Sequence, residues 1–300
     1  MVEDERVTEA GGDPDAGYEA KATLELVRLM NEVDAAVPAA VAAAAPALAD
    51  AIDAVSSRMR AGGRLVYVGA GTSGYVAALD ASECQATFSL PPGAVVALVA
   101  GGTTSSPLVQ AAVEDDGEAG ERDLAALDIE PGDAVVGVSA SGSTPYVLGA
   151  VGAAAGRGAL TAAVVCAHGS LLGSLVDHEI AVVVGPEFIA GSTRLKAGTA
   201  QKLVLNTLST VAMIRLGKTY GNLMVDVVAA NEKLAERVRR IVAIASGAGA
   251  EEVADALAAA DGDARVAIVA LKAGVDAAAA RARLDAADRS IAAALEEDGS

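Results

Sequence analysis

The chain has 300 residues, of which 53% are hydrophobic and 2% aromatic, and its formal net charge is −18. A chain of this length and apolar content buries a substantial core, so it is not a disordered protein. The excess of acids repels phosphate backbones, and aromatic side chains for base stacking are scarce, so no nucleic-acid partner is expected. The apolar runs are broken before about 18 residues, so no membrane span is expected either.

The cellular compartment is expected to be the cytoplasm. The N-terminal segment opens with acids and has no apolar core of the kind that a secretory signal has. Two cysteines, Cys84 and Cys166, fit a reducing compartment in which both are structural thiols. The two histidines, His168 and His178, have no ligand partners at metal-binding spacing, so no transition-metal site is expected.

The residue pattern over 1–60 predicts a polar tail followed by two helices. Thr23 is the expected N-cap of an amphipathic helix, and a second helical run is expected over 35–59, ended by Gly62 and Gly63. We predict three domains: a tail with helices at 1–60, a ligand-binding domain at 61–238, and a helical C-terminal subdomain at 239–300.

Apolar strand candidates then recur at spacings that leave room for helices between them. They lie at 65–68, 95–99, 134–138, 162–165 and 180–184. This alternation predicts an α/β fold with a parallel sheet flanked by helices. A long buried helix is expected over 193–215. Beyond Glu232 the chain reads as short Ala-rich helices, broken at Gly247, Gly249, Gly262 and Gly274.

Two turns rich in hydroxyl groups follow the first and third predicted strands. The first reads GAGTSG, and the second reads SASGSTP, with its proline suited to the first turn of a helix. Ligands of open α/β sheets bind where the strands end, and helix starts attract anions. One such turn is often only a helix entry, but two favour a sugar phosphate. The candidate binding residues in them are Gly71, Thr72, Ser73, Ser139, Ser141, Ser143 and Thr144.

Two glutamates downstream of strand-turn patterns suggest acid/base chemistry. Glu83 lies in a small, apolar stretch of the helix after the first turn, where partial desolvation would raise its pKa and keep it protonated as a general acid. A capping or surface carboxylate is the ordinary alternative. Glu114 lies in an acidic run, which is typical of a solvated helix face. Arg194 and Lys196 either complement an anion or stabilise a turn.

The sequence resembles N-acetylmuramic acid 6-phosphate etherases, which are lyases of the sugar isomerase (SIS) class. The resemblance covers nearly the whole chain and is carried by GGRLVYVGAGTSG, LDASEC, AVEDD, SGSTPYV, GPEFIAGSTRLKAGTAQKLVLNTLST, IRLGKTYGNLMVDV and ANEKL. It implies a SIS-type doubly wound parallel sheet with a C-terminal helical appendage. It also implies a cofactor-free β-elimination that removes D-lactate from the open-chain sugar phosphate, followed by water addition. A homodimer with its site near the subunit interface is implied as well.

The resemblance assigns roles to particular residues. Glu83 matches the acid that protonates the departing ether oxygen, and Glu114 matches the second glutamate, which is the base at C2. The hydroxyls of the two turns would hold the 6-phosphate, and Lys196 joins the substrate-binding set. The family pattern has arginine directly after GTSG and after the ASG of the second turn, where this chain has Tyr75 and Ser143.

Two alternative functions would use the same two hydroxyl-rich turns. One is a sugar-phosphate isomerase, or another lyase that acts on an amino-sugar phosphate. The other is a SIS sensor that binds a sugar phosphate without turnover. A sensor has no use for paired acid/base groups, so the presence of both Glu83 and Glu114 favours an enzyme.

Overall fold

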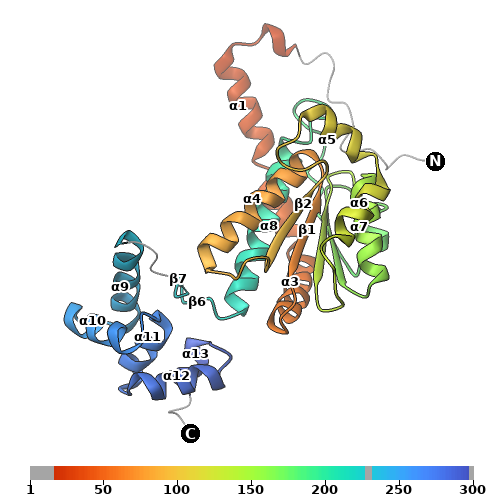
Figure 1. Cartoon of the computed structure of the whole chain (residues 1–300). Coiled ribbons are helices and arrows are strands. Elements are labelled where there is room, and N and C mark those ends of the chain that lie inside the picture. Colours follow the sequence, from red (N-terminus) through yellow and green to blue (C-terminus); the bar gives the residue numbers. More distant parts are fainter. Residues whose placement is uncertain (1–16, 227–231, 297–300) are drawn as a thin grey trace. The chain divides into compact units, whose positions relative to one another are not determined.

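The computed structural model describes residues 17–226 and 232–296. The predicted tail up to residue 16 and the start of the ANEKL stretch lie outside the described residues. The described chain forms two compact units (Figure 1). One runs up to Glu83 and over Pro92–Ser209, and the other consists of Cys84–Pro91 and the chain from Thr210 on. The domain boundaries at residues 61 and 239 stay predictions.

A five-stranded parallel sheet forms the centre of the first unit, in the order β2-β1-β3-β4-β5. Its strands are β1 (Leu65–Gly69), β2 (Val95–Val99), β3 (Ala134–Val138), β4 (Leu160–Val165) and β5 (His178–Ala181). The predicted parallel α/β sheet is confirmed. The fifth strand lies earlier than its predicted range, because its pairing with β4 ends at Ala181 and the apolar run 182–184 continues beyond the ladder.

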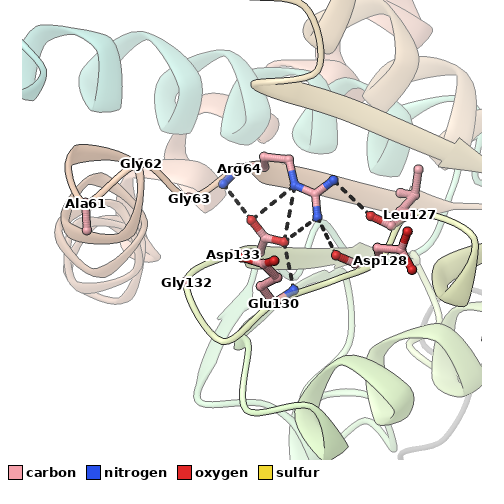
Figure 2. Close-up of a pocket in the computed structure, with 9 residues that line it drawn as sticks. All are labelled: Ala61, Gly62, Gly63, Arg64, Leu127, Asp128, Glu130, Gly132 and Asp133. Atoms are coloured by element: carbon pink, nitrogen blue, oxygen red, sulfur yellow. Dashed lines mark hydrogen bonds and ion pairs between the residues drawn. The ribbon is translucent and has the colours of Figure 1, made fainter.

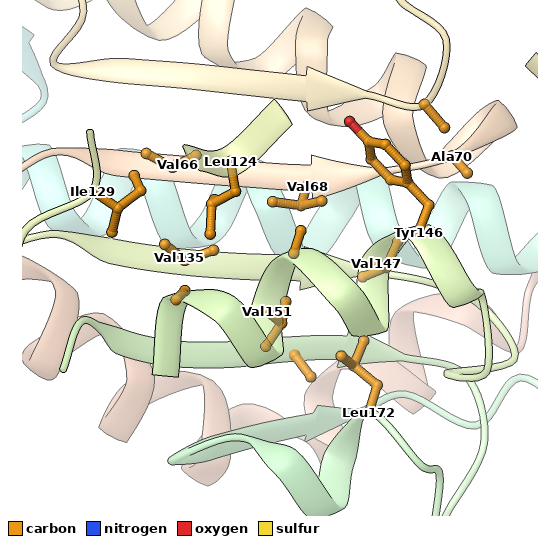
Figure 3. Close-up of a cluster of buried hydrophobic side chains, with 14 of the residues drawn as sticks. Val66, Val68, Ala70, Leu124, Ile129, Val135, Tyr146, Val147, Val151 and Leu172 are labelled. Atoms are coloured by element: carbon orange, nitrogen blue, oxygen red, sulfur yellow. The ribbon is translucent and has the colours of Figure 1, made fainter. Parts of the chain in front are cut away.

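Helices cover both faces of this sheet. They include α3 (Ala45–Arg60), α4 (Gly71–Phe88), α5 (Pro107–Glu114), α6 (Gly117–Ala125), α7 (Pro145–Gly156) and α8 (Lys196–Arg215). Alternate strand residues point to opposite faces. Val66 and Val68 of β1 therefore join Tyr146 and Val147 of α7 in one buried cluster (Figure 3). Tyr67, between them in sequence, points to the other face.

A buried carboxylate joins three elements on that other face. Asp80 of α4 is 4% exposed and accepts hydrogen bonds from Tyr67 Oη at 2.9 Å, from Asn206 Nδ2 at 2.6 Å and from Ser209 Oγ at 3.1 Å. Burial raises the pKa of Asp80, although the three donors oppose that shift. These hydrogen bonds hold helices α4 and α8 to strand β1 on the face of the sheet to which Tyr67 points.

The N-terminal helices differ from the predicted pair. Thr23 is the first residue of α1 (Thr23–Asp34), and Ala22 occupies the N-cap position, so the N-cap prediction was wrong. The single run predicted over 35–59 is two helices, α2 (Val37–Ala43) and α3, each with a proline in its first turn. A proline fits only at a helix start, because it lacks the N–H that an interior position must donate. The predicted end is confirmed, since α3 ends at Arg60 and Gly62, two residues on, has φ +95°.

No single helix among the described residues is long and apolar enough to cross a membrane. Only the stretch Thr23–Ala43 taken together with Ala45–Arg60, which is bent by 57°, reaches that length and composition. Tyr18, in a short 3₁₀ turn (Tyr18–Ala20) before α1, stacks on Phe188 with ring centroids 4.6 Å apart.

The second unit is a bundle of short helices with a two-stranded hairpin, β6 (Thr219–Tyr220) and β7 (Leu223–Met224). Its helices are α9 (Glu232–Ser246), α10 (Ala250–Ala259), α11 (Ala264–Ala273), α12 (Ala277–Ala286) and α13 (Ile291–Glu296). The predicted breaks at Gly247, Gly249, Gly262 and Gly274 are confirmed. Asp226 forms ion pairs with Lys218 and, at 3.0 Å, with the nearly buried Arg265.

Helices α6 and α7 pack through their backbones. A Cβ atom at Gly149 of α7 would overlap the carbonyl oxygen of Gly117, and one at Gly120 of α6 would overlap the carbonyl oxygen of Tyr146. The opposing atoms belong to the main chain and have no rotamers through which to move away. This crossing therefore requires glycine on both helices.

We expect Gly149→Ala to lower the free energy of unfolding by about 3 kcal/mol, because the added methyl group must push two helix backbones apart. Gly152→Ala is the matched control on the same helix, since a Cβ there meets nothing within 4 Å. Alanine favours helix over glycine, so the control should gain about 0.5–1 kcal/mol. Urea denaturation of both variants measures the difference. Equal stabilities for the two would contradict the close crossing.

Candidate functional site

The two predicted turns lie side by side at the carboxyl edge of the sheet. Strands β1 and β3 are parallel neighbours, and their last residues, Gly69 and Val138, pair in register. Each strand leads through its turn into a helix, α4 from Gly71 and α7 from Pro145. The prediction that both turns share one edge is confirmed. The unpaired N–H groups at these two helix starts suit an anion.

The first turn is compact and contacts the start of α8. Gly71 has φ +51°, and a Cβ atom at Gly74 would lie 2.8 Å from the carbonyl oxygen of Gly69, so the turn folds back on its own strand. Ser73 Oγ donates to Gln201 Oε1 of α8 at 3.0 Å. Thr72 packs beside Gly198, where a Cβ would lie 3.2 Å from Thr72 Cγ2. Both hydroxyl residues of this turn are half-buried.

The second turn is held by its own hydroxyl groups. Buried Ser139 accepts from the Gly142 N–H at 3.0 Å and lies 3.0 Å from Thr144 Oγ1. Ser143 is exposed, and its Oγ donates to Ser141 Oγ at 2.9 Å. Ser139 therefore shapes the loop from inside. The hydroxyls of Ser141, Ser143 and Thr144 are the more accessible ones.

Lys196 lies at the start of α8, but its side chain is directed into the protein. It is 5% exposed, and its Nζ donates to the Val184 carbonyl oxygen at 2.6 Å. Sequence reasoning missed the residue beside it. Glu187 is 4% exposed, and its carboxylate accepts from the backbone N–H groups of Lys196 and Ala197, each at 2.9 Å. The helix start of α8 is thus already occupied by an anion of the protein itself.

Glu83 lies on α4, twelve residues after its first residue Gly71, which corresponds to about 18 Å along the helix axis. Its side chain is exposed, so the predicted partial desolvation is wrong for this chain taken alone. Two exposed apolar residues precede it at four-residue spacing, Tyr75 at 43% and Leu79 at 57% exposure. Residues spaced by four share one face of a helix. Glu83 therefore lies next to an exposed apolar stripe formed by Tyr75 and Leu79.

Glu114 ends α5, and its surroundings differ from the predicted solvated face. It is half-buried, and desolvation raises its pKa, with the charge of Asp115 raising it further. Gly117, three residues on, approaches the second turn, because a Cβ there would lie 3.3 Å from the Pro145 carbonyl oxygen. A carboxylate with a raised pKa beside the carboxyl edge of the sheet is suited to accept a proton near neutral pH.

A surface pocket of about 480 Å³ lies at the opposite, amino edge of the sheet (Figure 2). Its lining comes from the segments that precede β1 and β3. Most donors of Arg64 are engaged there, since it pairs with Asp133 at 2.6 Å and donates to the carbonyl oxygens of Leu127 and Asp128. These bonds account for four of its five N–H donors, so this arginine stabilises the loop before β3 and has little left to offer an anion. The candidate site is therefore the carboxyl edge.

The fold defines the class of protein. The family model described as "Glucokinase regulatory protein N-terminal SIS domain" matches residues 47–155. A phosphoheptose isomerase from Francisella tularensis has a similar structure, with a TM-score of 0.52 and 23% identity over 64% of this chain and 98% of that chain. The sheet with its flanking helices is a SIS domain.

Closer relatives define the family. The N-acetylmuramic acid 6-phosphate etherase of Rubrobacter xylanophilus is 58% identical over 293 residues, which cover 98% of this chain and 97% of that relative. The protein of the same description from Streptomyces avermitilis is 58% identical over 273 residues, with 91% and 88% covered. The chain belongs to the N-acetylmuramic acid 6-phosphate etherase family. The resemblance stated from its motifs is confirmed.

Proposed function

We propose that this protein cleaves the D-lactyl ether of N-acetylmuramic acid 6-phosphate, giving N-acetylglucosamine 6-phosphate and D-lactate. Nearly full-length identity of 58% to a protein described as this etherase is the observation that carries the proposal. The two adjacent turns support it, because hydroxyl groups and free helix N–H groups suit the phosphate. Thr72 and Ser73 of the first turn, with Ser141, Ser143 and Thr144 of the second, are the proposed contacts; Gly71 would allow close approach.

The reaction needs two carboxyl groups in opposite protonation states. The C1 aldehyde of the open-chain sugar acidifies the C2 proton, and the Glu114 carboxylate removes it as general base. The bond between C3 and the ether oxygen then breaks. Glu83, as general acid, gives its proton to that oxygen, so that lactate leaves with a hydroxyl group. Water adds at C3 of the unsaturated aldehyde, and C2 regains a proton.

The direct test is incubation of the purified protein with N-acetylmuramic acid 6-phosphate and enzymatic assay of D-lactate. Release of lactate together with N-acetylglucosamine 6-phosphate supports the etherase. An isomerase would change the sugar without releasing lactate, and a sensor would bind the sugar phosphate without turnover. Either result would replace the proposal.

The raised pKa of Glu114 gives a pH prediction. A base works only when ionised, so kcat/KM should fall as the pH drops through the Glu114 pKa. Because the charge of Asp115 helps to raise that pKa, Asp115→Asn should lower it and move the acidic limb of the profile to lower pH. Profiles of kcat/KM for both proteins measure this. An unmoved limb would assign it to another group.

We further propose that the protein is a cytoplasmic homodimer in which a second copy covers the exposed face of α4. Tyr75 and Leu79 place large apolar surface next to Glu83. Such surface is typical of protein interfaces. Burial under a second copy would also shield Glu83 from solvent, which suits its role as a general acid.

Leu79→Glu should therefore convert the dimer to monomer and lower lactate release in the same proportion, because a charge would be buried in the interface. Sedimentation velocity gives the mass, and the lactate assay gives the activity. Leu175→Glu is the control, since Leu175 is 48% exposed on a different element. A Leu79→Glu variant that remains dimeric would refute this interface.

A further inference from the structure

A hydrogen bond joins the helices that carry the two glutamates. Gln110 Nε2 of α5 donates to Tyr75 Oη of α4 at 2.6 Å. Tyr75 lies eight residues before Glu83 on α4, and Gln110 lies four residues before Glu114 on α5. Residues four apart share a face of a helix, so each partner lies on the same side of its helix as the glutamate that follows it.

Gln110 is also the anchor of α5. It is 8% exposed, whereas Leu108 and Val109 beside it are 84% and 47% exposed. Among the α5 side chains that the structure describes, Gln110 is the one that is fully buried, and Val113 and Glu114 are half-buried. Gln110, together with Val113, which packs against the buried cluster, thus holds this short helix to the domain.

Both donors of the Gln110 amide are in use. Besides Tyr75, the amide donates to the Gly102 carbonyl oxygen at 2.8 Å. Gly101 packs directly on the helix, since a Cβ there would lie 3.2 Å from Gln110 Cα, and both glycines have positive φ. The loop after β2 therefore packs closely against Gln110 and accepts a hydrogen bond from it. Loss of the Tyr75 hydroxyl would leave one buried N–H of the amide without its partner.

We propose that Tyr75 and Gln110 are positioning residues that fix the Glu114 carboxylate relative to Glu83. The inference rests on the proposed function, in which one sugar must contact both carboxyl groups. A phenol oxygen accepts a hydrogen bond from an amide, so Tyr75 supplies a tie between the two helices.

The test combines Tyr75→Phe, Gln110→Leu and the double variant. Each single variant should lower kcat by about ten- to a hundredfold with KM nearly unchanged, because a misplaced base slows chemistry more than binding. The double variant should be no slower than the slower single variant, since each single variant already removes the hydrogen bond between the two side chains. Losses that multiply, or a change mainly in KM, would overturn the proposal. Leu108→Ala, on the exposed side of α5, is the control.

A second measurement does not depend on activity. Amide hydrogen exchange over residues 107–114 should be about tenfold faster in Tyr75→Phe than in the wild type, because α5 loses part of its anchor. Exchange that is unchanged there would refute the tie. A wild-type protein that releases no lactate would instead refute the proposed function, and the exchange measurement would still decide whether Tyr75 holds α5.

Discussion

Replacement of Glu83 by glutamine is expected to lower D-lactate release by about a thousandfold while the C2 proton still exchanges with solvent. Glutamine keeps the shape of the side chain but has no acidic proton for the ether oxygen. The base is untouched, so removal and return of the C2 proton continue. The measurements are the lactate assay and, in D₂O, the loss of the C2 proton signal by NMR.

The control for Glu83 is a glutamate of the same unit that has no proposed role. Glu121 on α6 is exposed, and Glu121→Gln should release lactate at the wild-type rate. If Glu83→Gln lost exchange as well as release while remaining folded, Glu83 would be acting before the leaving group departs. The assignment of acid and base would then have to be reversed.

Replacement of Glu114 by glutamine should abolish both processes. Without the carboxylate, the C2 proton is not removed, so exchange and lactate release should each fall by about a thousandfold. The fold should survive, because Glu114 is half-buried at the end of a helix and glutamine is nearly isosteric. The same NMR and lactate measurements apply, with thermal unfolding as the check on folding.

Glu118→Gln is the matched control for Glu114, because Glu118 lies four residues on and its side chain is 87% exposed. It should keep both exchange and release. Wild-type exchange at C2 in the Glu114→Gln protein would show that another group is the base. The pair of variants at residues 83 and 114 thus separates the two halves of the elimination.

The sheet could be predicted because buried parallel strands have a strong signature. Runs such as 95–99 and 134–138 are apolar on both faces, and their bounds agree with the structure. The two turns could be predicted to meet, because strand ends share an edge in a parallel sheet. The bend between α2 and α3 was missed, although Pro38 and Pro46 in their first turns were a usable signal.

The polar contacts that the sequence did not reveal join residues far apart in the chain. Gln110 contacts Tyr75 across 35 residues, and Asn206 contacts Asp80 across 126. Neither spacing has a periodicity that a sequence pattern could detect. The exposure of Glu83 was missed for another reason: its small apolar neighbours Ala81 and Cys84 are buried, but Glu83 lies on the exposed face of the same helix.

The carboxylate of Glu187 affects which helix starts remain open to an anion. Three helix starts lie in this region, at α4, α7 and α8, and each offers partial positive charge. Glu187 neutralises the start of α8, so an incoming phosphate meets only the two turns that remain open. The protein in effect carries its own counter-ion at the third position. In the proposed function, the starts of α4 and α7 would then be the helix starts that bind the phosphate.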